Sequence, residues 1–367
     1  MTDQVVTPAP PDEAAADTRR PLRRGRRGGR RRSILRRLVT LPFLLLGMTL
    51  LMFLISRFLP ADPAVAFLGN NGADNQQAVD AFNAKYGLDR PLWEQYWIYL
   101  DRLLHGDLGT SISTSRPVAD ELASAFPATL ELAVAALLVS LVIGIPLGIL
   151  AAARRASLFD RLTGGATLLG VSMPPFVLAL LALQVLYLRL GWVAGPGRLD
   201  PFLDPPPTVT GLMTVDALLA GQPDVALDVL HHLVLPAVVL GIIHGAFFAR
   251  VVRSTMVDAL RGDFVRTARG KGLSGRVIVG RHAFRFALIP TLSLVGLTFG
   301  ELFAGAITVE TITGWPGVGR YMYNAATKLD FPAVMAGTLL IGIAYVLVNL
   351  VVDLLYGVAD PRVEEAS

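Results

Sequence analysis

The chain has 367 residues, of which 53% are hydrophobic and only 17% charged, and its mean hydropathy is +0.53. Soluble domains carry about 25% charged residues, so this composition indicates several membrane spans rather than an ordinary soluble domain. The chain contains no cysteine, which excludes a disulfide framework and any thiolate metal or redox site. The net charge is only +4, but basic residues are concentrated in a few segments.

The first such segment lies at the N-terminus, where eleven arginines fall between residues 19 and 37. Residues 1–32 cannot build a core, and we predict a disordered basic cytoplasmic tail. An arginine block of this kind can bind RNA or anionic lipid. Because an apolar run follows at once, we interpret it as the charge that orients the first span, and we expect no nucleic-acid binding.

Residues 33–58 are predicted to form the first transmembrane helix. Its apolar run, 38–58, is longer than the core of about 7–15 residues in a signal peptide, so we expect it to be retained. Five more apolar segments are long enough to span, at about 20 residues each. Prolines in or near the spans suggest kinks. The five segments are 129–153, 162–190, 233–252, 287–309 and 333–356.

The connections between spans alternate in charge. Residues 59–122 hold four basic and nine acidic residues, and residues 191–231 hold one arginine and five aspartates. The connection between spans two and three holds Arg154, Arg155 and Arg161, and the connection between spans four and five is also basic. The positive-inside rule therefore places both termini and the connection at 261–286 in the cytoplasm.

The acidic connection after the first span is too long for a simple turn. We predict a small external cap of short helices at 59–125. The core membrane domain then covers 126–363, and a short tail covers 364–367.

Motifs for chemistry are absent from the sequence. Lys271 lies in a Gly-Lys-Gly sequence, but a phosphate-binding loop needs an earlier glycine and a serine or threonine after the lysine. The zinc-protease motif His-Glu-x-x-His and the serine-hydrolase motif Gly-x-Ser-x-Gly are also missing. We therefore expect no catalytic residues, metal site or cofactor in this chain. If ATP drives its activity, the ATPase is another polypeptide.

Polar residues in a span are costly in lipid and normally face the bundle interior or a wet cavity. The fifth span repeats such residues at helical spacing, which places them on one stripe. We interpret the stripe as the lining of a pathway, and hydrogen bonding between helices is the alternative. His244 of span four either joins the lining or is an ordinary core histidine. The stripe consists of Thr291, Thr298, Glu301, Gly305 and Thr308.

The basic connection between spans four and five is predicted to contain a short helix starting at Asp263 and ended by Gly270 and Gly272. A second helix, 275–286, leads into span five. An ordinary basic loop is the simplest alternative. It does not account for the placed alanines and glycines or for the length of the segment.

This connection resembles the signature loop of permeases in ATP-binding-cassette importers. That loop reads Glu-Ala-Ala, three residues, then Gly; here Arg266, Thr267 and Ala268 stand in the first three places and Gly272 in the last. The sequences "RTARGKGLS" and "RHAFRFALIP" are similar to the dipeptide/oligopeptide/nickel subgroup. Further matches, "GDLGTSI", "PATLELA", "VETITGWPGVGR" and "VNLVVDLLYGVADPRV", extend the resemblance over 36–363.

The resemblance implies an all-α integral membrane protein with six transmembrane helices of the type I ABC importer permease kind. It implies an external helical cap between spans one and two, and a cytoplasmic coupling helix between spans four and five. The expected cargo is a di- or oligopeptide; nickel, glutathione or another small solute is the alternative. A stand-alone channel or secondary transporter is the alternative from another class.

The same resemblance implies partners. We expect a second, homologous permease subunit in a heterodimer, two cytoplasmic ATPase subunits that hold ATP and Mg, and an extracytoplasmic substrate-binding protein. The assembly would lie in the lipid bilayer of a bacterial plasma membrane. Two surfaces follow from it: an external docking or gate surface at Trp315, Pro316 and Arg320, and an ATPase-coupling surface. The coupling residues would be Asp263, Arg266, Thr267, Ala268, Lys271, Gly272 and Leu273.

Overall fold

The computed structural model describes residues 28–58, 76–86 and 88–359. Within these ranges every regular element is helical, and the one β-bridge joins Thr110 to Pro117. The predicted all-α class is therefore confirmed for the described chain. Most of the predicted tail, residues 59–75 of the predicted cap and the C-terminal tail lie outside the described residues.

The described helices follow one another along the chain, joined by short turns and by two longer loops at 105–117 and 190–212. Two of them, η1 and η2, are π-helical segments that continue a preceding α-helix. The elements are α1 (Gly28–Phe58), α3 (Gln76–Tyr86), α4 (Leu92–Leu104), α5 (Val118–Ala153), α6 (Leu158–Ser172), α7 (Pro175–Ala182), η1 (Leu183–Arg189), α8 (Met213–Leu219), α9 (Pro223–Ala259), α10 (Asp263–Gly270), α11 (Gly275–Val277), η2 (Ile278–Ala283), α12 (Phe284–Thr313), α13 (Val318–Thr327) and α14 (Phe331–Ala359).

Five described helices are long and apolar enough to cross a membrane: those at α1, α5, α9, α11–α12 and α14. The predicted third span, 162–190, is not one straight helix. Its two halves, α6 and α7–η1, meet at an angle of 103°. Pro174 and Pro175 cause the break, since Met173 must leave the helical region before a proline and has ψ 124°. Counting the bent pair as one span gives the six that were predicted.

Helix ends differ from the predicted bounds because an apolar run marks only the part of a helix suited to lipid. α5 begins at Val118 after Pro117, eleven residues before the predicted span. α9 begins at Pro223 and α12 runs on to Thr313. α1 begins at Gly28, five residues before the predicted start of the first transmembrane helix at residue 33.

The centre of the bundle is the crossing of α5 and α9, where glycines let the two backbones touch. A Cβ on Gly144 would lie 2.5 Å from the carbonyl oxygen of Gly245, and one on Gly148 would lie 2.7 Å from that of Ala249. Such contacts exclude any side chain. Around this crossing α12 packs on α9 and α5, α14 packs on α12, and α1 packs on α14. The most buried large side chains here include Leu132, Leu240 and Phe303.

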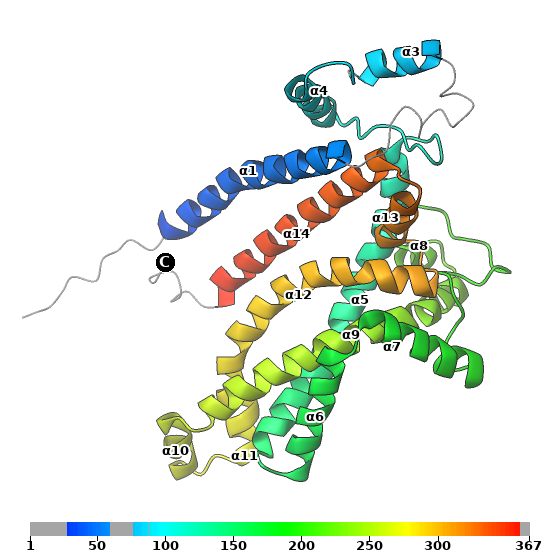
Figure 1. The fold of residues 1–367 in the computed structure, drawn as a ribbon. Helices are drawn as coiled ribbons and strands as arrows, with labels where there is room; N and C mark the ends of the chain where they lie inside the picture. Colours follow the sequence, from blue (N-terminus) through cyan, green and yellow to red (C-terminus); the bar gives the residue numbers. More distant parts are fainter. Residues whose placement is uncertain (1–27, 59–75, 87, 360–367) are drawn as a thin grey trace, which may run out of the picture.

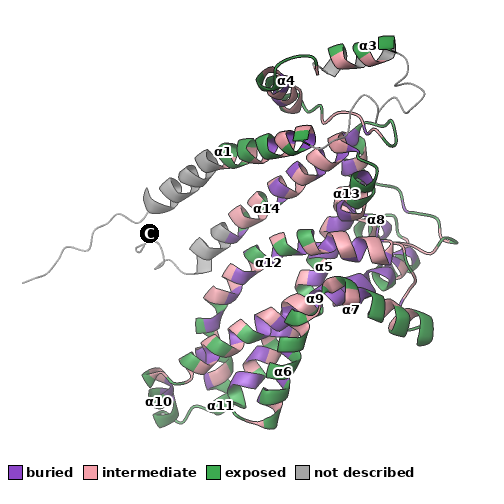
Figure 2. Cartoon of the chain, in the orientation of Figure 1, coloured by how far each residue is buried: buried purple, intermediate pink, exposed green. Residues whose placement is uncertain are grey.

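The bundle has two distinct ends, seen in Figure 1. Helices α10 and α11 lie at one end, called here the α10 end. Helices α3, α4 and α13 lie at the other, called the α13 end. Figure 2 shows that burial is concentrated where α5, α9 and α12 meet, while much of α1, α6 and α7 is exposed. Exposed apolar helix surface of this kind suits contact with lipid or with other subunits.

Replacing Gly148 by alanine should destabilise the protein. Overpacking against Ala249 costs about 1–3 kcal/mol, which outweighs the gain of about 1 kcal/mol from replacing glycine inside a helix. The matched control is Gly164→Ala, because a Cβ there meets no atom within 4 Å. Thermal unfolding of the purified protein should show a lower melting temperature for Gly148→Ala only. Equal melting temperatures for both variants would show that the close crossing is not a stability constraint.

Candidate functional site

The α10 end carries the predicted coupling segment. α10 spans Asp263–Gly270 and α11 starts at Gly275, so both predicted helices are present. The buried side of α10 packs Val265 and Ala268 against Ile278, with Phe264 stacked on Phe286 at a ring distance of 5.0 Å. This small core holds α10 to the start of the long helix that continues as α12.

The other side of α10 is exposed in the described part of the chain, so most of the predicted residues are available to a partner. Ala268 is the exception, because it is buried in the core beneath α10. Arg269 is also exposed on this side of the helix but stands outside the signature positions, so the signature did not indicate it. The exposed residues are Asp263, Arg266, Thr267, Arg269, Lys271, Gly272 and Leu273.

Gly272 ends the segment through its backbone conformation. Its φ is +75°, in the left-handed region that glycine adopts without strain. Its N–H donates to Arg269, and the N–H of Leu273 donates to the carbonyl oxygen of Ala268, which closes the helix C-terminus. A Cβ at this position would meet nothing within 4 Å. The glycine is therefore required here for its conformation, and the space around it is open.

A charged clasp joins the base of α9 to α6 near the α10 end. Arg253 of α9 donates from Nε and Nη2 to both carboxylate oxygens of Asp160, with an Nη2–Oδ2 distance of 2.9 Å. Asp160 also accepts from the N–H of Ala156, whose φ is +62°. Bidentate pairs of this kind fix geometry as well as adding energy. The clasp fixes the loop between α5 and α6 relative to α9, ten residues before α10.

The predicted polar stripe of α12 divides into two parts. Thr291 and Thr298 are buried between helices, and the Thr291 hydroxyl donates to its own helix at Ala287. Glu301 has 64% of its side chain exposed, and Thr308 is half-buried. Together with Leu297 and Ala304 they form an uncovered face of α12.

Glu301 gives this uncovered face its chemical character. Its Oε2 lies 3.7 Å from Nδ1 of His244 on α9, whose side chain is only 12% exposed. A carboxylate within a span is costly against lipid. The Glu301 face is therefore suited to water, a solute or another subunit, and His244 belongs beside it.

The turn between α12 and α13 is anchored by Trp315. This side chain is fully buried, and its Nε1 donates to the carbonyl oxygen of Ala128 on α5 at 2.8 Å. Arg198 of the loop after η1 lies over its ring, 5.6 Å from the centroid. Of the three predicted gate residues, Pro316 is exposed, Arg320 is half-buried and Trp315 faces inward. Trp315 thus positions the turn from beneath.

Glu310 is the centre of this anchor and is fully buried. Its Oε1 accepts from the Thr129 hydroxyl at 2.6 Å, and its Oε2 accepts from the N–H of Arg320 at 2.9 Å. Thr129 in turn accepts from the N–H of Val318 at 2.7 Å. The carboxylate therefore joins α5, α12 and α13. Glu310 was not among the predicted site residues, because it lies one residue past the predicted end of span five.

Two further carboxylates hold the loop between η1 and α9. Glu131 of α5 accepts from Arg198 at 2.6 Å and from the N–H of Thr214 at 3.0 Å. Asp216 accepts four hydrogen bonds from Val209, Thr210 and Gly211. Burial acts to raise the pKa of the Asp216 carboxyl, but these hydrogen bonds outweigh it and hold the pKa below its usual value.

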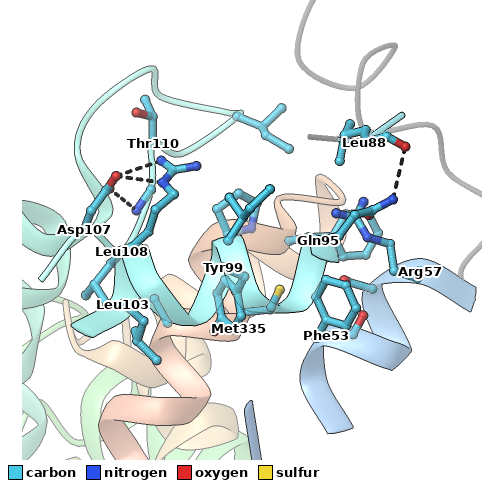
Figure 3. Close-up of a pocket in the computed structure, with 18 residues that line it drawn as sticks. Phe53, Arg57, Leu88, Gln95, Tyr99, Leu103, Asp107, Leu108, Thr110 and Met335 are labelled. Atoms are coloured by element: carbon cyan, nitrogen blue, oxygen red, sulfur yellow. Dashed lines mark hydrogen bonds and ion pairs between the residues drawn. The ribbon is translucent and has the colours of Figure 1, made fainter. Parts of the chain in front are cut away.

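A cavity lies away from the Glu301 face, at the α13 end (Figure 3). It has a volume of about 1000 Å³ including its open mouth, and α1, α4 and α14 contribute to its walls. Figure 3 shows Phe53 of α1 and Tyr99 of α4 side by side in its wall, with their rings stacked. Burial, and then the neighbouring Tyr96, raise the pKa of Tyr99 to about 12. Among the described residues no group of three or more His, Cys, Asp and Glu could hold a metal ion.

A membrane-spanning helical bundle with a carboxylate on an uncovered span face and an exposed basic helix at one end has the features of a transport subunit. The comparisons with known proteins give the family. Residues 144–365 match the model of the binding-protein-dependent transport system inner membrane component, and residues 31–133 match the N-terminal model of the same systems. The chain belongs to this family and is an integral inner-membrane protein.

Relatives with assigned names cover nearly the whole chain. The probable D,D-dipeptide transport system permease protein DdpB of Escherichia coli K12 is 46% identical over 86% of this chain and 93% of its own length. The di/tripeptide transport system permease protein DppB of Pseudomonas aeruginosa is 44% identical over 90% of this chain and 98% of its own length. The dipeptide permease protein DppB of E. coli K12 is 40% identical over the same shares. A solved structure of the inward-facing MetNI methionine ABC transporter has a TM-score of 0.47 at 16% identity, covering 64% of this chain and 93% of that chain.

Replacing Thr129 by valine tests the Glu310 anchor without changing side-chain size much. The N–H of Val318 and one oxygen of Glu310 lose their partner, at about 1–3 kcal/mol for each unpaired buried group. The melting temperature should fall by several degrees, since 1 kcal/mol corresponds to about 2–4 °C in larger domains. The control is Thr311→Val, which loses only a bond to Ile307 of its own helix. Equal shifts in both variants would contradict the anchor.

Acidification should remove the contribution of the Asp216 carboxylate to the stability of the folded protein. Its pKa is lower in the folded protein than the usual 3.8, so the unfolded chain binds more protons in acid and stability falls as pH drops below that value. The difference in melting temperature between wild type and Asp216→Asn should be full near pH 7 and shrink below about pH 3.8. Asp204→Asn, at an exposed position in the same loop, should show no such difference. A pH-independent difference for Asp216→Asn would contradict this interpretation.

Proposed function

We propose that this chain is a permease subunit of an ATP-driven importer of di- or oligopeptides. The observation that carries the proposal is α10, a short basic helix held to the bundle by its buried side and open on its other side. Such a helix fits a groove on a partner protein, and its arginines and lysine fit acidic groups there. ATP is then bound and hydrolysed by partner ATPase subunits, and this chain carries out no bond chemistry.

The proposed topology follows from the charges of the connections. With the α10 end in the cytoplasm, α10 meets the ATPases, and both chain termini lie on the same side of the membrane. The α13 end then faces outward, where the turn around Pro316 meets a substrate-binding protein. The bent pair α6 and α7–η1 counts as the third of six spans.

Coupling would depend on α5 and α9 moving as one rigid body. Their backbones are in contact at Gly144 and Gly148, and the clasp between Asp160 and Arg253 fixes the α5–α6 loop to α9. Force applied to α10 would therefore move α5, α6 and α9 together. Such rigid-body rotations are a common way for a small displacement to change a whole bundle.

The uncovered face of α12 would form half of the pathway, and a second permease subunit the other half. Glu301 supplies a carboxylate there, which suits the ammonium end of a peptide. The names of the relatives favour peptide as the cargo. Nickel is not favoured by the described residues, among which no group of three or more His, Cys, Asp and Glu could hold a metal ion.

The double substitution Arg266→Glu and Lys271→Glu should abolish coupling. Charge reversal at a docking surface costs several kcal/mol, and each 1.4 kcal/mol is about tenfold in affinity. In cells expressing the chain with its genomic neighbours, uptake of labelled dipeptide and co-purification of the ATPase should both fall more than about tenfold.

The control is Lys328→Glu, an exposed position at the α13 end, which should retain both. Normal uptake and normal ATPase association in the double variant would exclude α10 as the coupling site. Dipeptide uptake by the purified chain without any ATPase would favour a stand-alone transporter.

A further inference from the structure

Helix α4 lies beside α1 instead of standing clear of it. Tyr96 and Tyr99 of α4 pack on Phe53 of α1. Their ring centroids lie 5.4 and 6.2 Å, respectively, from the centroid of the Phe53 ring. The Tyr96 hydroxyl lies 3.1 Å from that of Thr49 and donates to the carbonyl oxygen of Leu46 at 3.3 Å. The contacts between these two helices therefore extend well down the first span.

The positions of these contacts give the depth of α4. Leu46 and Thr49 precede the end of α1 at Phe58 by twelve and nine residues, which is about 18 and 13 Å at 1.5 Å per residue. The described apolar part of α1 runs over Leu41–Phe58. A helix that bonds to Leu46 thus lies at the level of the bilayer at the α13 end, and not above it as a soluble cap.

A side of α4 next to the one that packs on α1 exposes apolar and aromatic side chains, with the exposed Asp101 at its edge. Trp93 is 65% exposed, Trp97 63% and Leu104 78%. Their spacings of four and seven residues place them on one side of the helix. Exposed tryptophans are unusual on a soluble surface but are enriched where membrane meets water.

We infer that α4 is an interfacial helix whose face of Trp93, Trp97 and Leu104 inserts into the lipid leaflet at the α13 end. This is the outer leaflet in the topology proposed above, but the inference itself needs only that α1 spans the membrane. Lipid is favoured over a protein partner on this side of α4, because the neighbouring helix α1 also exposes apolar residues, including Leu51 and Ile55, at the same level. One lipid-facing surface would then extend from α1 onto α4.

An anchored α4 would hold the chain that follows it. The loop after α4 is joined to the start of α14, where the Ser111 hydroxyl donates to the fully buried Asp330 at 2.6 Å. Arg102 of α4 pairs with Asp107 of the same loop at 2.8 Å. Lipid contact on one side and these bonds on the other would keep α4 fixed while other helices move.

The chain lacks cysteine, so a single introduced cysteine can carry a spin label at a chosen site. Trp97→Cys and Trp93→Cys would each be labelled in the full chain, purified with its co-expressed partners and placed in phosphatidylcholine nanodiscs. Collision with oxygen reports lipid, and collision with a water-soluble nickel chelate reports water. The controls are Leu51→Cys on α1 for lipid and Phe202→Cys, in an exposed loop, for water.

Both α4 labels should resemble Leu51→Cys, with oxygen collisions several-fold above nickel collisions. A pattern like that of Phe202→Cys would show a water-facing helix and overturn the inference. Low access to both reagents would show a covering protein, such as a second subunit, and would also overturn it. A second measurement uses unlabelled protein in brominated lipid: Trp93→Phe with Trp97→Phe should reduce the lipid quenching of tryptophan fluorescence, and unchanged quenching would count against lipid contact.

Discussion

The contact between the backbones of α5 and α9 is the constraint on which the rest of the structure depends. Glycines at 144, 148 and 245 allow this approach, and in a membrane close packing of this kind replaces the hydrophobic force that drives soluble cores. Once these two helices are fixed, α6 and α12 have defined surfaces to pack on, and α13 and α14 follow. The pair thereby links the α10 end to the α13 end.

Buried polar networks specify the geometry at both ends of this pair. Asp160 with Arg253 fixes the α10 end, and Glu310 with Thr129 fixes the α13 end. Buried polar networks whose groups are all hydrogen-bonded make a structure more rigid, while breaking one leaves an unpaired buried group at a cost in stability. Their partners come from helices far apart in sequence, so each network can form in only one arrangement of the bundle. Glu301 differs from these buried carboxylates, because 64% of its side chain is exposed.

The sequence predicted what composition and periodicity control. Apolar runs located the spans, and the signature positions located α10 and the glycine that ends it. The break between α6 and α7 was indicated only as a kink, because the prolines show where a helix bends and not by how much. Ala268 and Trp315 face inward because of the helices that pack beside them, and the local sequence does not indicate which helices these are. Glu310 lay just past a predicted boundary, and its partners are up to 181 residues away.

The central claim is that α5 and α9 form one rigid unit that carries α10. The relative position of the two helices can be measured in the assembled transporter with spin labels on cysteines introduced at Arg155, after α5, and at Arg261, after α9. Pulsed electron paramagnetic resonance gives the distance between the two labels. Both positions are exposed, and the chain has no other cysteine to interfere. We expect one distance between the labels, and the same distance in the resting transporter and in the transporter trapped with ATP and vanadate. A shift of several ångströms, or two distances in the trapped state, would contradict the rigid unit.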